Sequence, residues 1–239
     1  EVCPSKNKYA CKNSLRYVPG LFIIISKKEN TFSSRKGDAF MYNIITIERR
    51  YASGGHEIGK KLAESLGYKL YDRNILLEAA QKLDIPFYNI ETLEESSSGN
   101  VLLNLSKTPL GGLSGNKNLP LADQLFLEEK RIVEKAAEEG NCVIVGRASG
   151  YILKDVENAL HVFVYASHEK RIQRAIEREG IQKAEAENAL KKNDKRRKNF
   201  YNALTTHEWG DPKNYDLYMN AGNLGIDLCV RILMEAAKG

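Results

Sequence analysis

The chain has 239 residues, of which 42% are hydrophobic and 28% charged, a composition typical of a soluble globular domain with a sizeable core. The formal net charge is +5. Eight of the 36 Lys/Arg and three of the 31 Asp/Glu fall in residues 1–40, which leaves 28 of each sign in the remainder. The charge therefore gives no support for nucleic-acid binding, and we expect no nucleic-acid partner.

The apolar run at residues 21–25 is far shorter than the roughly 20 residues of a membrane span. We expect a cytoplasmic protein with no membrane partner. Cys142 and Cys229 lie in apolar stretches, without the spacing of a zinc or redox motif, and are expected to be reduced core residues.

Residues 1–40 show neither helical nor strand periodicity, and Met41 directly precedes the first clear strand. We expect 1–40 to be a disordered or non-native extension and the folded domain to occupy 41–239. The alternative is a short structured arm in which residues 21–25 add a strand.

The domain opens with a β-branched run at 42–47, a Gly/Ser loop at 51–55 and an amphipathic helix. Ile58, Leu62 and Leu66 recur at every fourth position of this helix, and Gly67 closes it. A strand, a glycine loop and a helix in this order form the opening unit of an α/β nucleotide-binding fold.

The remaining sequence continues to alternate strands and helices. Further strands are expected at 69–71, 142–145, 161–165 and 215–219. Further helices are expected at 72–83, at 121–139, after the capping residue Ser167, at 183–202 and at 226–237. Residues 96–119 have an irregular pattern that favours a flexible insertion or lid. This alternation predicts a parallel sheet of about five strands with helices on both faces and a ligand site at the carboxyl ends of the strands.

The glycine loop allows two registers. In one, residues 54–60 match G-x-x-x-x-G-K and Lys60 binds phosphate, but Lys61 then stands where Ser or Thr usually holds magnesium. In the other, which the Ile58 stripe favours, the helix begins at Gly55 or His56, and phosphates lie over the amides of residues 53–56. The expected donor-nucleotide contacts are Ser53, Gly54, Gly55, His56, Glu57 and Lys60. Glu57 is also the expected magnesium ligand, and a tight turn without a ligand is the alternative to both registers.

Three segments resemble the cytidylate-kinase-like proteins. They are residues 45–76, ITIERRYASGGHEIGKKLAESLGYKLYDRNIL; residues 142–153, CVIVGRASGYIL; and residues 193–227, NDKRRKNFYNALTTHEWGDPKNYDLYMNAGNLGID. The resemblance implies a three-layer P-loop kinase fold with a helical lid at about 183–214. It also implies ATP with Mg²⁺ as the phosphoryl donor and a nucleoside monophosphate, typically CMP or dCMP, as the acceptor.

Phosphoryl transfer depends mainly on positioning and on neutralising charge, so arginines are the expected catalytic groups. Arg147 ends a buried strand and is expected to clamp the acceptor phosphate with its planar fork; a salt bridge is the alternative. Arg196 and Arg197 lie in the basic run 194–198 and are expected to close over the donor phosphates, although such a run is commonly a solvated helix face.

Two further residues are expected in the acceptor pocket. Arg49 follows the first strand, close to the phosphates. Asp72 can cap the next helix, and the resemblance adds a contact to the acceptor.

Two positions depart from the family pattern, which usually carries Gly at Ala52 and Arg at His56. They motivate a second hypothesis, a nucleotide-binding sensor or regulatory domain with little catalysis. A dinucleotide-dependent oxidoreductase is disfavoured because G-x-G-x-x-G does not follow the first strand.

Overall fold

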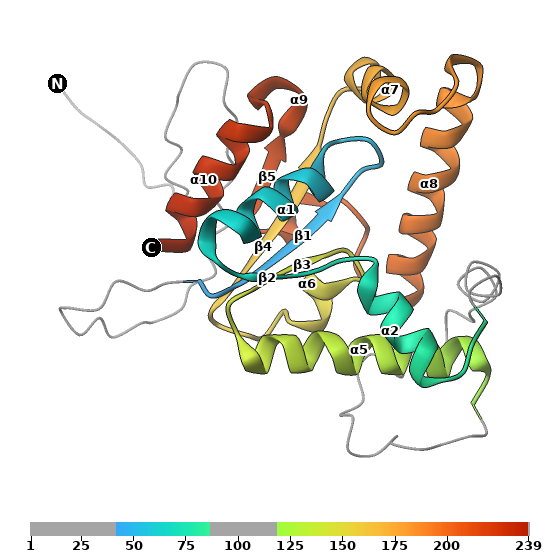
Figure 1. Cartoon of the computed structure of the whole chain (residues 1–239), viewed down its shortest axis with the longest axis vertical. Coiled ribbons are helices and arrows are strands. Elements are labelled where there is room, and N and C mark those ends of the chain that lie inside the picture. The colour runs from blue at the N-terminus through green and yellow to red at the C-terminus, as the bar shows by residue number, and fades with distance from the viewer. Residues whose placement is uncertain (1–41, 87–118, 239) are drawn as a thin grey trace, which may run out of the picture.

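A computed structural model of the chain describes residues 42–86 and 119–238 (Figure 1). The expectations for residues 1–40 and for nearly all of 96–119 lie outside these residues. Within them, the strands are β1 (Ile44–Arg49), β2 (Lys69–Tyr71), β3 (Cys142–Val145), β4 (Ala159–Tyr165) and β5 (Leu217–Asn220). They form one sheet in the order β2-β3-β1-β4-β5, and each neighbouring pair is parallel. The predicted five-stranded parallel sheet is confirmed.

The helices follow the strands in the predicted order. They are α1 (Gly55–Leu66), α2 (Asn74–Lys82), α5 (Leu121–Glu139), α6 (Ser149–Ile152), α7 (His168–Glu177), α8 (Lys183–Leu204), α9 (Ala221–Leu224) and α10 (Ile226–Lys238), with a 3₁₀ turn at Pro212–Asn214. Ser167 caps α7 by accepting a hydrogen bond from the Lys170 N–H, at 3.4 Å. The four-residue helices α6 and α9 were not predicted, because they are too short to show a helical period.

Alternating side chains of the strands build a core on each face of the sheet (Figure 1). Ile45 and Ile47 of β1 pack with α1 and α10, whereas Ile44 packs with α2 and α5 on the opposite face. Cys142 and Cys229 are buried and free, as predicted. Burial raises the pKa of the Cys142 thiol to about 12 and that of Cys229 to about 11. The architecture is the predicted three-layer α/β fold.

A third core cluster, between α5, α6, β4 and α8, is aromatic. Phe163 of β4 is fully buried and meets the rings of Trp209, Tyr215 and Tyr218 at centroid distances of 5.0 to 5.6 Å. Tyr201 near the end of α8 is buried in the same cluster. The carboxyl-terminal half of α8 is therefore anchored to the domain. No helix within residues 42–86 and 119–238 is long and apolar enough to cross a membrane.

The contact of α1 with β3 depends on Gly59. A Cβ atom at this position would lie 2.7 Å from Cγ2 of Val145. Helix propensity alone predicts that Gly59→Ala stabilises the protein by about 1 kcal/mol. We expect the opposite result, a loss of about 1–2 kcal/mol in the free energy of unfolding measured in urea, because the buried contact is overpacked.

Ser65→Ala is the matched control, because Ser65 is exposed on the same helix. It should change the free energy of unfolding by less than about 0.5 kcal/mol. A Gly59→Ala protein more stable than wild type would show that α1 does not approach β3 this closely.

Candidate functional site

The turn between β1 and α1 has a fixed backbone. Gly54 has φ 89°, and Ala52 adopts a left-handed φ of 54°, a conformation that favours glycine. This explains why glycine is usual at position 52 in the resembling family. The Ser53 hydroxyl donates to the carbonyls of Arg50, at 2.8 Å, and Val164, at 3.1 Å. Ser53 therefore ties the turn to the ends of β1 and β4.

The first turn of α1 presents backbone donors. The helix begins at Gly55, and its first hydrogen bond runs from the Ile58 N–H to the Gly54 carbonyl, at 2.9 Å. The N–H groups of Gly55, His56 and Glu57 precede that bond and have no acceptor within the helix. They point toward the positive end of the helix dipole, as an anion site requires. The register based on the Ile58 stripe is thus the observed one, and Lys60 is an exposed residue one turn further along.

Two helices hold the turn through Tyr51. The Tyr51 N–H donates to Oδ1 of Asp194 on α8, at 2.8 Å, and its carbonyl accepts from Nε of Arg171 on α7, at 2.7 Å. Nη2 of Arg171 also pairs with Oδ2 of Asp194, at 2.6 Å. These three bonds join the turn to α7 and α8. Both helices lie beyond the carboxyl end of β1, the end at its arrowhead (Figure 1).

Sequence reasoning missed this role of Arg171 and Asp194. The available signal was Asp194 itself, an acid at the head of the basic run 194–198. A solvated basic face does not require a carboxylate there.

The predicted arginines come together at the carboxyl edge of the sheet. Nη1 of Arg197 donates to the Arg49 carbonyl, at 3.0 Å. A Cβ atom at Gly146 would overlap the Arg49 guanidinium, so the end of β1 and the end of β3 are in contact here. Arg147 and Arg196 are close enough to Arg49 to lower its pKa. Four cations from β1, β3 and α8 therefore share one region.

The electrostatics of this region indicate a shortage of negative charge. Burial lowers the pKa of Arg49, and the charges of Arg147 and Arg196 lower it further, against the opposing effect of Glu48. Burial and the nearby Arg49 lower the pKa of Arg197 to about 9. Removal from water is the main cause of both shifts, and the neighbouring guanidinium charges add to it. An anion bound among them would relieve the repulsion.

Arg147 leaves β3 through an unusual backbone. Gly146, Arg147 and Ala148 have φ values of 83°, 61° and 51°, three left-handed residues in succession. Strain at non-glycine residues of this kind is concentrated at functional sites. Nη1 of Arg147 lies 3.1 Å from Oε1 of Glu129 on α5, and its guanidinium stacks 4.8 Å from the ring centroid of Phe200. The turn thus directs Arg147 into the space between α5 and α8.

Asp72 and His56 meet across the site. Nε2 of His56 lies 2.8 Å from Oδ2 of Asp72, and the Asn74 N–H donates to Oδ1 of Asp72, at 3.1 Å. Burial raises the pKa of Asp72, but hydrogen bonds from His56 and Asn74 outweigh it and leave the pKa below its ordinary value. Asp72 is therefore ionised at neutral pH and links the start of α2 to the first turn of α1.

Glu57 faces cations rather than an open site. Its Oε2 pairs with Nη2 of Arg174 on α7, and its Oε1 lies 3.7 Å from Nζ of Lys61. The bond from Arg174 keeps the pKa of Glu57 below its ordinary value. In this arrangement the carboxylate is not free to bind Mg²⁺ directly. The described residues also contain no group of three or more His, Cys, Asp or Glu that could hold a metal ion.

Glu48 is a buried carboxylate that sequence reasoning did not select. Glu48 is the second-to-last residue of β1, directly before Arg49, and is only 4% exposed. Burial raises the pKa of Glu48, while Arg49 and Arg197 oppose that shift. Oε1 of Glu48 has no hydrogen-bond partner within the parts of the chain that the structure describes. The net effect is a raised pKa, and Glu48 is the buried carboxyl group that faces Arg49 and Arg197.

The model of the cytidylate kinase-like family matches residues 44–223, which include every element of the site described above. The chain belongs to the cytidylate kinase-like family. Its three-layer architecture is the P-loop kinase fold of that family.

Curated relatives of this cytidylate kinase-like protein include two archaeal enzymes. It is 28% identical to a cytidylate kinase of Archaeoglobus fulgidus over 81% of this chain and 94% of that protein. It is 26% identical to a cytidylate kinase of Thermococcus kodakarensis over 81% of this chain and 86% of that protein. A uronate isomerase of Corynebacterium glutamicum is 26% identical over 149 residues, but the chain spans only 29% of that protein.

Among solved structures, an uncharacterized protein from Eubacterium ventriosum is similar to this cytidylate kinase-like chain, with 27% identity and a TM-score of 0.61. The match covers 81% of this chain and 97% of the other. The sheet and its surrounding helices are therefore shared with an experimentally determined structure.

The Tyr51 contacts lead to a stability prediction. Asp194→Ala removes the acceptor of the Tyr51 amide and leaves the buried Arg171 without its carboxylate. We expect the free energy of unfolding in urea to fall by about 3 kcal/mol, because a buried charge loses its partner.

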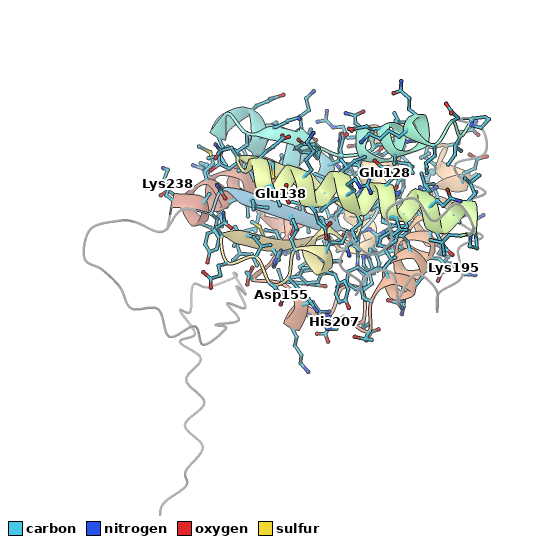
Figure 2. The ribbon with its side chains drawn as sticks, turned by 90° about the horizontal axis from the view of Figure 1, so that it is seen from below. Glu128, Glu138, Asp155, Lys195, His207 and Lys238 are labelled. Atoms are coloured by element: carbon cyan, nitrogen blue, oxygen red, sulfur yellow. The ribbon has the colours of Figure 1, made fainter. Side chains whose placement is uncertain are left out.

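Asp155→Ala removes an exposed carboxylate from the loop between α6 and β4, labelled in Figure 2, and serves as the control. Its effect should stay below about 0.5 kcal/mol. Equal losses for the two variants would contradict the role assigned to Asp194.

Proposed function

We propose that this protein transfers the γ-phosphoryl group of ATP to a nucleoside monophosphate, with CMP or dCMP as the preferred acceptor. The observation that carries the proposal is the convergence of Arg49, Arg147, Arg196 and Arg197 beside the amino-terminal end of α1. Family membership and the archaeal relatives named cytidylate kinase support the same chemistry.

The donor phosphates would lie over the amides of Gly54, Gly55 and His56. The Ser53 amide contributes less, because it already donates to the Arg50 carbonyl, at 3.3 Å. An oxygen of the acceptor phosphate attacks the γ-phosphorus, the bond to the β–γ bridging oxygen breaks, and ADP leaves with the electron pair.

Each arginine has a position suited to one part of this transfer. Arg147, on the α5 side, would orient the acceptor phosphate, and Arg49 would contact it from the end of β1. Arg196 and Arg197 would neutralise charge on the moving phosphoryl group and help to exclude water. Asp72 would fix His56 beside the donor phosphates and line the acceptor pocket.

Magnesium normally accompanies ATP and would supply further charge neutralisation on the phosphate oxygens. Glu57 is paired with Arg174 and Lys61 before the nucleotide binds, and the ion would be held mainly by the phosphate oxygens of the nucleotide. No step of the transfer is assigned to Glu57.

The second candidate is a nucleotide sensor that binds without appreciable turnover. The observation that favours it is that Arg147 and Arg174 already have carboxylate partners in Glu129 and Glu57. Ala52 and His56, which differ from the usual family residues, favour it as well.

Turnover by the full-length chain separates the two candidates. We expect ADP release, measured in a coupled assay with ATP and Mg²⁺, only when CMP or dCMP is added from a panel of nucleoside monophosphates and small alcohols. Saturable ATP binding without acceptor-dependent ADP release would support the sensor. Stimulation by an alcohol rather than by any monophosphate would refute the proposed acceptor.

Arg147 should act on the acceptor. We expect Arg147→Ala to weaken acceptor binding by about 1.5–3 kcal/mol, because a charge-assisted contact is lost, with little change for ATP. The double variant Arg147→Ala/Glu129→Gln avoids leaving the buried Glu129 carboxylate without its partner. Equal losses for donor and acceptor in that background would contradict this role.

Arg197 should stabilise the transition state by neutralising charge on the transferring phosphoryl group. We expect Arg197→Ala to lower kcat roughly 100-fold, because a preorganised charge at the transferring group is removed. Arg196→Ala should act in the same direction. The exposed Lys195 of the same run (Figure 2) gives the matched control, Lys195→Ala, which should keep kcat near the wild-type value. Similar effects of Lys195→Ala and Arg197→Ala would indicate only a general charge effect.

A further inference from the structure

The turn that precedes α1 lacks the lysine that commonly accompanies phosphate-binding amides. Gly55 occupies the usual lysine position. A Cβ atom at Gly55 would lie 2.6 Å from Cβ of Arg49 and 3.4 Å from Cβ of Val164. Packing therefore excludes a side chain at position 55, and a cation for the donor phosphates has to come from another element.

Arg174 of α7 lies directly against this turn. Its Cζ and Nε atoms are each 3.6 Å from the place where a Gly54 Cβ would be. Nε is buried and has no hydrogen-bond partner within the described residues. The neighbouring Arg171 is already bound to the Tyr51 carbonyl and to Asp194. Arg174 is thus the α7 arginine with a donor still available beside the glycine turn.

Glu57 neutralises Arg174 from the first turn of α1. Its carboxylate binds Nη2 of Arg174 beside the amino-terminal end of the helix, where negative charge is favourable. A phosphate oxygen at the same place would satisfy both the helix end and the guanidinium. Glu57 and a donor phosphate therefore compete for the same cation.

We infer that Arg174 is the side-chain cation for the donor phosphates and that Glu57 is the counter-ion the donor displaces. This inference rests on the proposed function. When ATP binds, Arg174 exchanges the Glu57 carboxylate for a phosphate oxygen. The released carboxylate turns to Lys61, whose Nζ is 3.7 Å from Oε1 of Glu57.

The two residues should affect ATP affinity in opposite directions. We expect Arg174→Ala in the full-length chain to raise the Kd for ATP about tenfold or more, because a charge-assisted contact is lost. Glu57→Gln should lower that Kd about two- to fivefold, because a competing anion is removed. The Kd is measured by titration calorimetry with and without Mg²⁺ and without any acceptor.

The matched control is Arg178→Ala, which removes an exposed cation directly after the end of α7. It should change the Kd less than twofold. Arg174→Lys, which keeps the charge but not the fork, should lie between wild type and Arg174→Ala. The Arg174→Lys variant also allows the Kd for ATP to be compared with wild type if the Arg174→Ala variant unfolds.

Two outcomes would overturn the inference. One is an equal change in Kd for Arg174→Ala and Arg178→Ala. The other is a Glu57→Gln variant that loses affinity only when Mg²⁺ is present, which would make Glu57 a metal ligand instead.

Binding without acceptor also separates this inference from the proposed function. Suppose that the wild-type protein binds ATP and the variants change the Kd as expected, but the wild type phosphorylates no monophosphate. This result would refute the proposed kinase activity and support the role of Arg174 in ATP binding. A wild-type protein that does not bind ATP would refute both.

Discussion

The central physical constraint on this protein is the placement of several guanidinium groups at the edge of a parallel sheet. Arg49 and Arg197 are half-buried, and the removal of their guanidinium groups from water lowers their pKa values; Arg147 and Arg196 lie nearby. Such a concentration of positive charge destabilises a fold unless carboxylates or a ligand offset it. Glu129, paired with Arg147, and Asp194, close to Arg197, supply part of that offset, and an anionic ligand would supply more.

The same acids also set the geometry. Asp194 holds the Tyr51 amide as well as Arg171, and Glu129 orients Arg147 against Phe200. Each carboxylate therefore fixes a cation and a structural element at the same time. This edge of the sheet is preorganised, which would lower the reorganisation needed for the proposed substrates to bind.

The sequence predicted the sheet, the order of the main helices and the start of α1, because these depend on local periodicity. Ile58 and Leu62 established the helical register, which placed the helix start at Gly55 or His56, and the structure begins α1 at Gly55. The contacts between Glu57 and Arg174 and between Tyr51 and Asp194 join residues 117 and 143 positions apart. Local patterns contain no information on such pairs. The expectation of Glu57 as a magnesium ligand therefore took no account of Arg174 and stays a prediction, and the bond between Asp194 and the Tyr51 amide was not predicted.

Three residues on one side of α8, Leu190, Asp194 and Arg197, restrict how the length of this helix can vary among homologous chains. Leu190 packs with Ala52 and Ala175, Asp194 binds Tyr51, and Arg197 reaches the Arg49 carbonyl. Their spacing of four and three residues places all three on one side of the helix. An insertion or deletion of one residue between 190 and 197 would rotate part of this group by about 100°. Homologous chains should therefore rarely carry insertions or deletions within this interval.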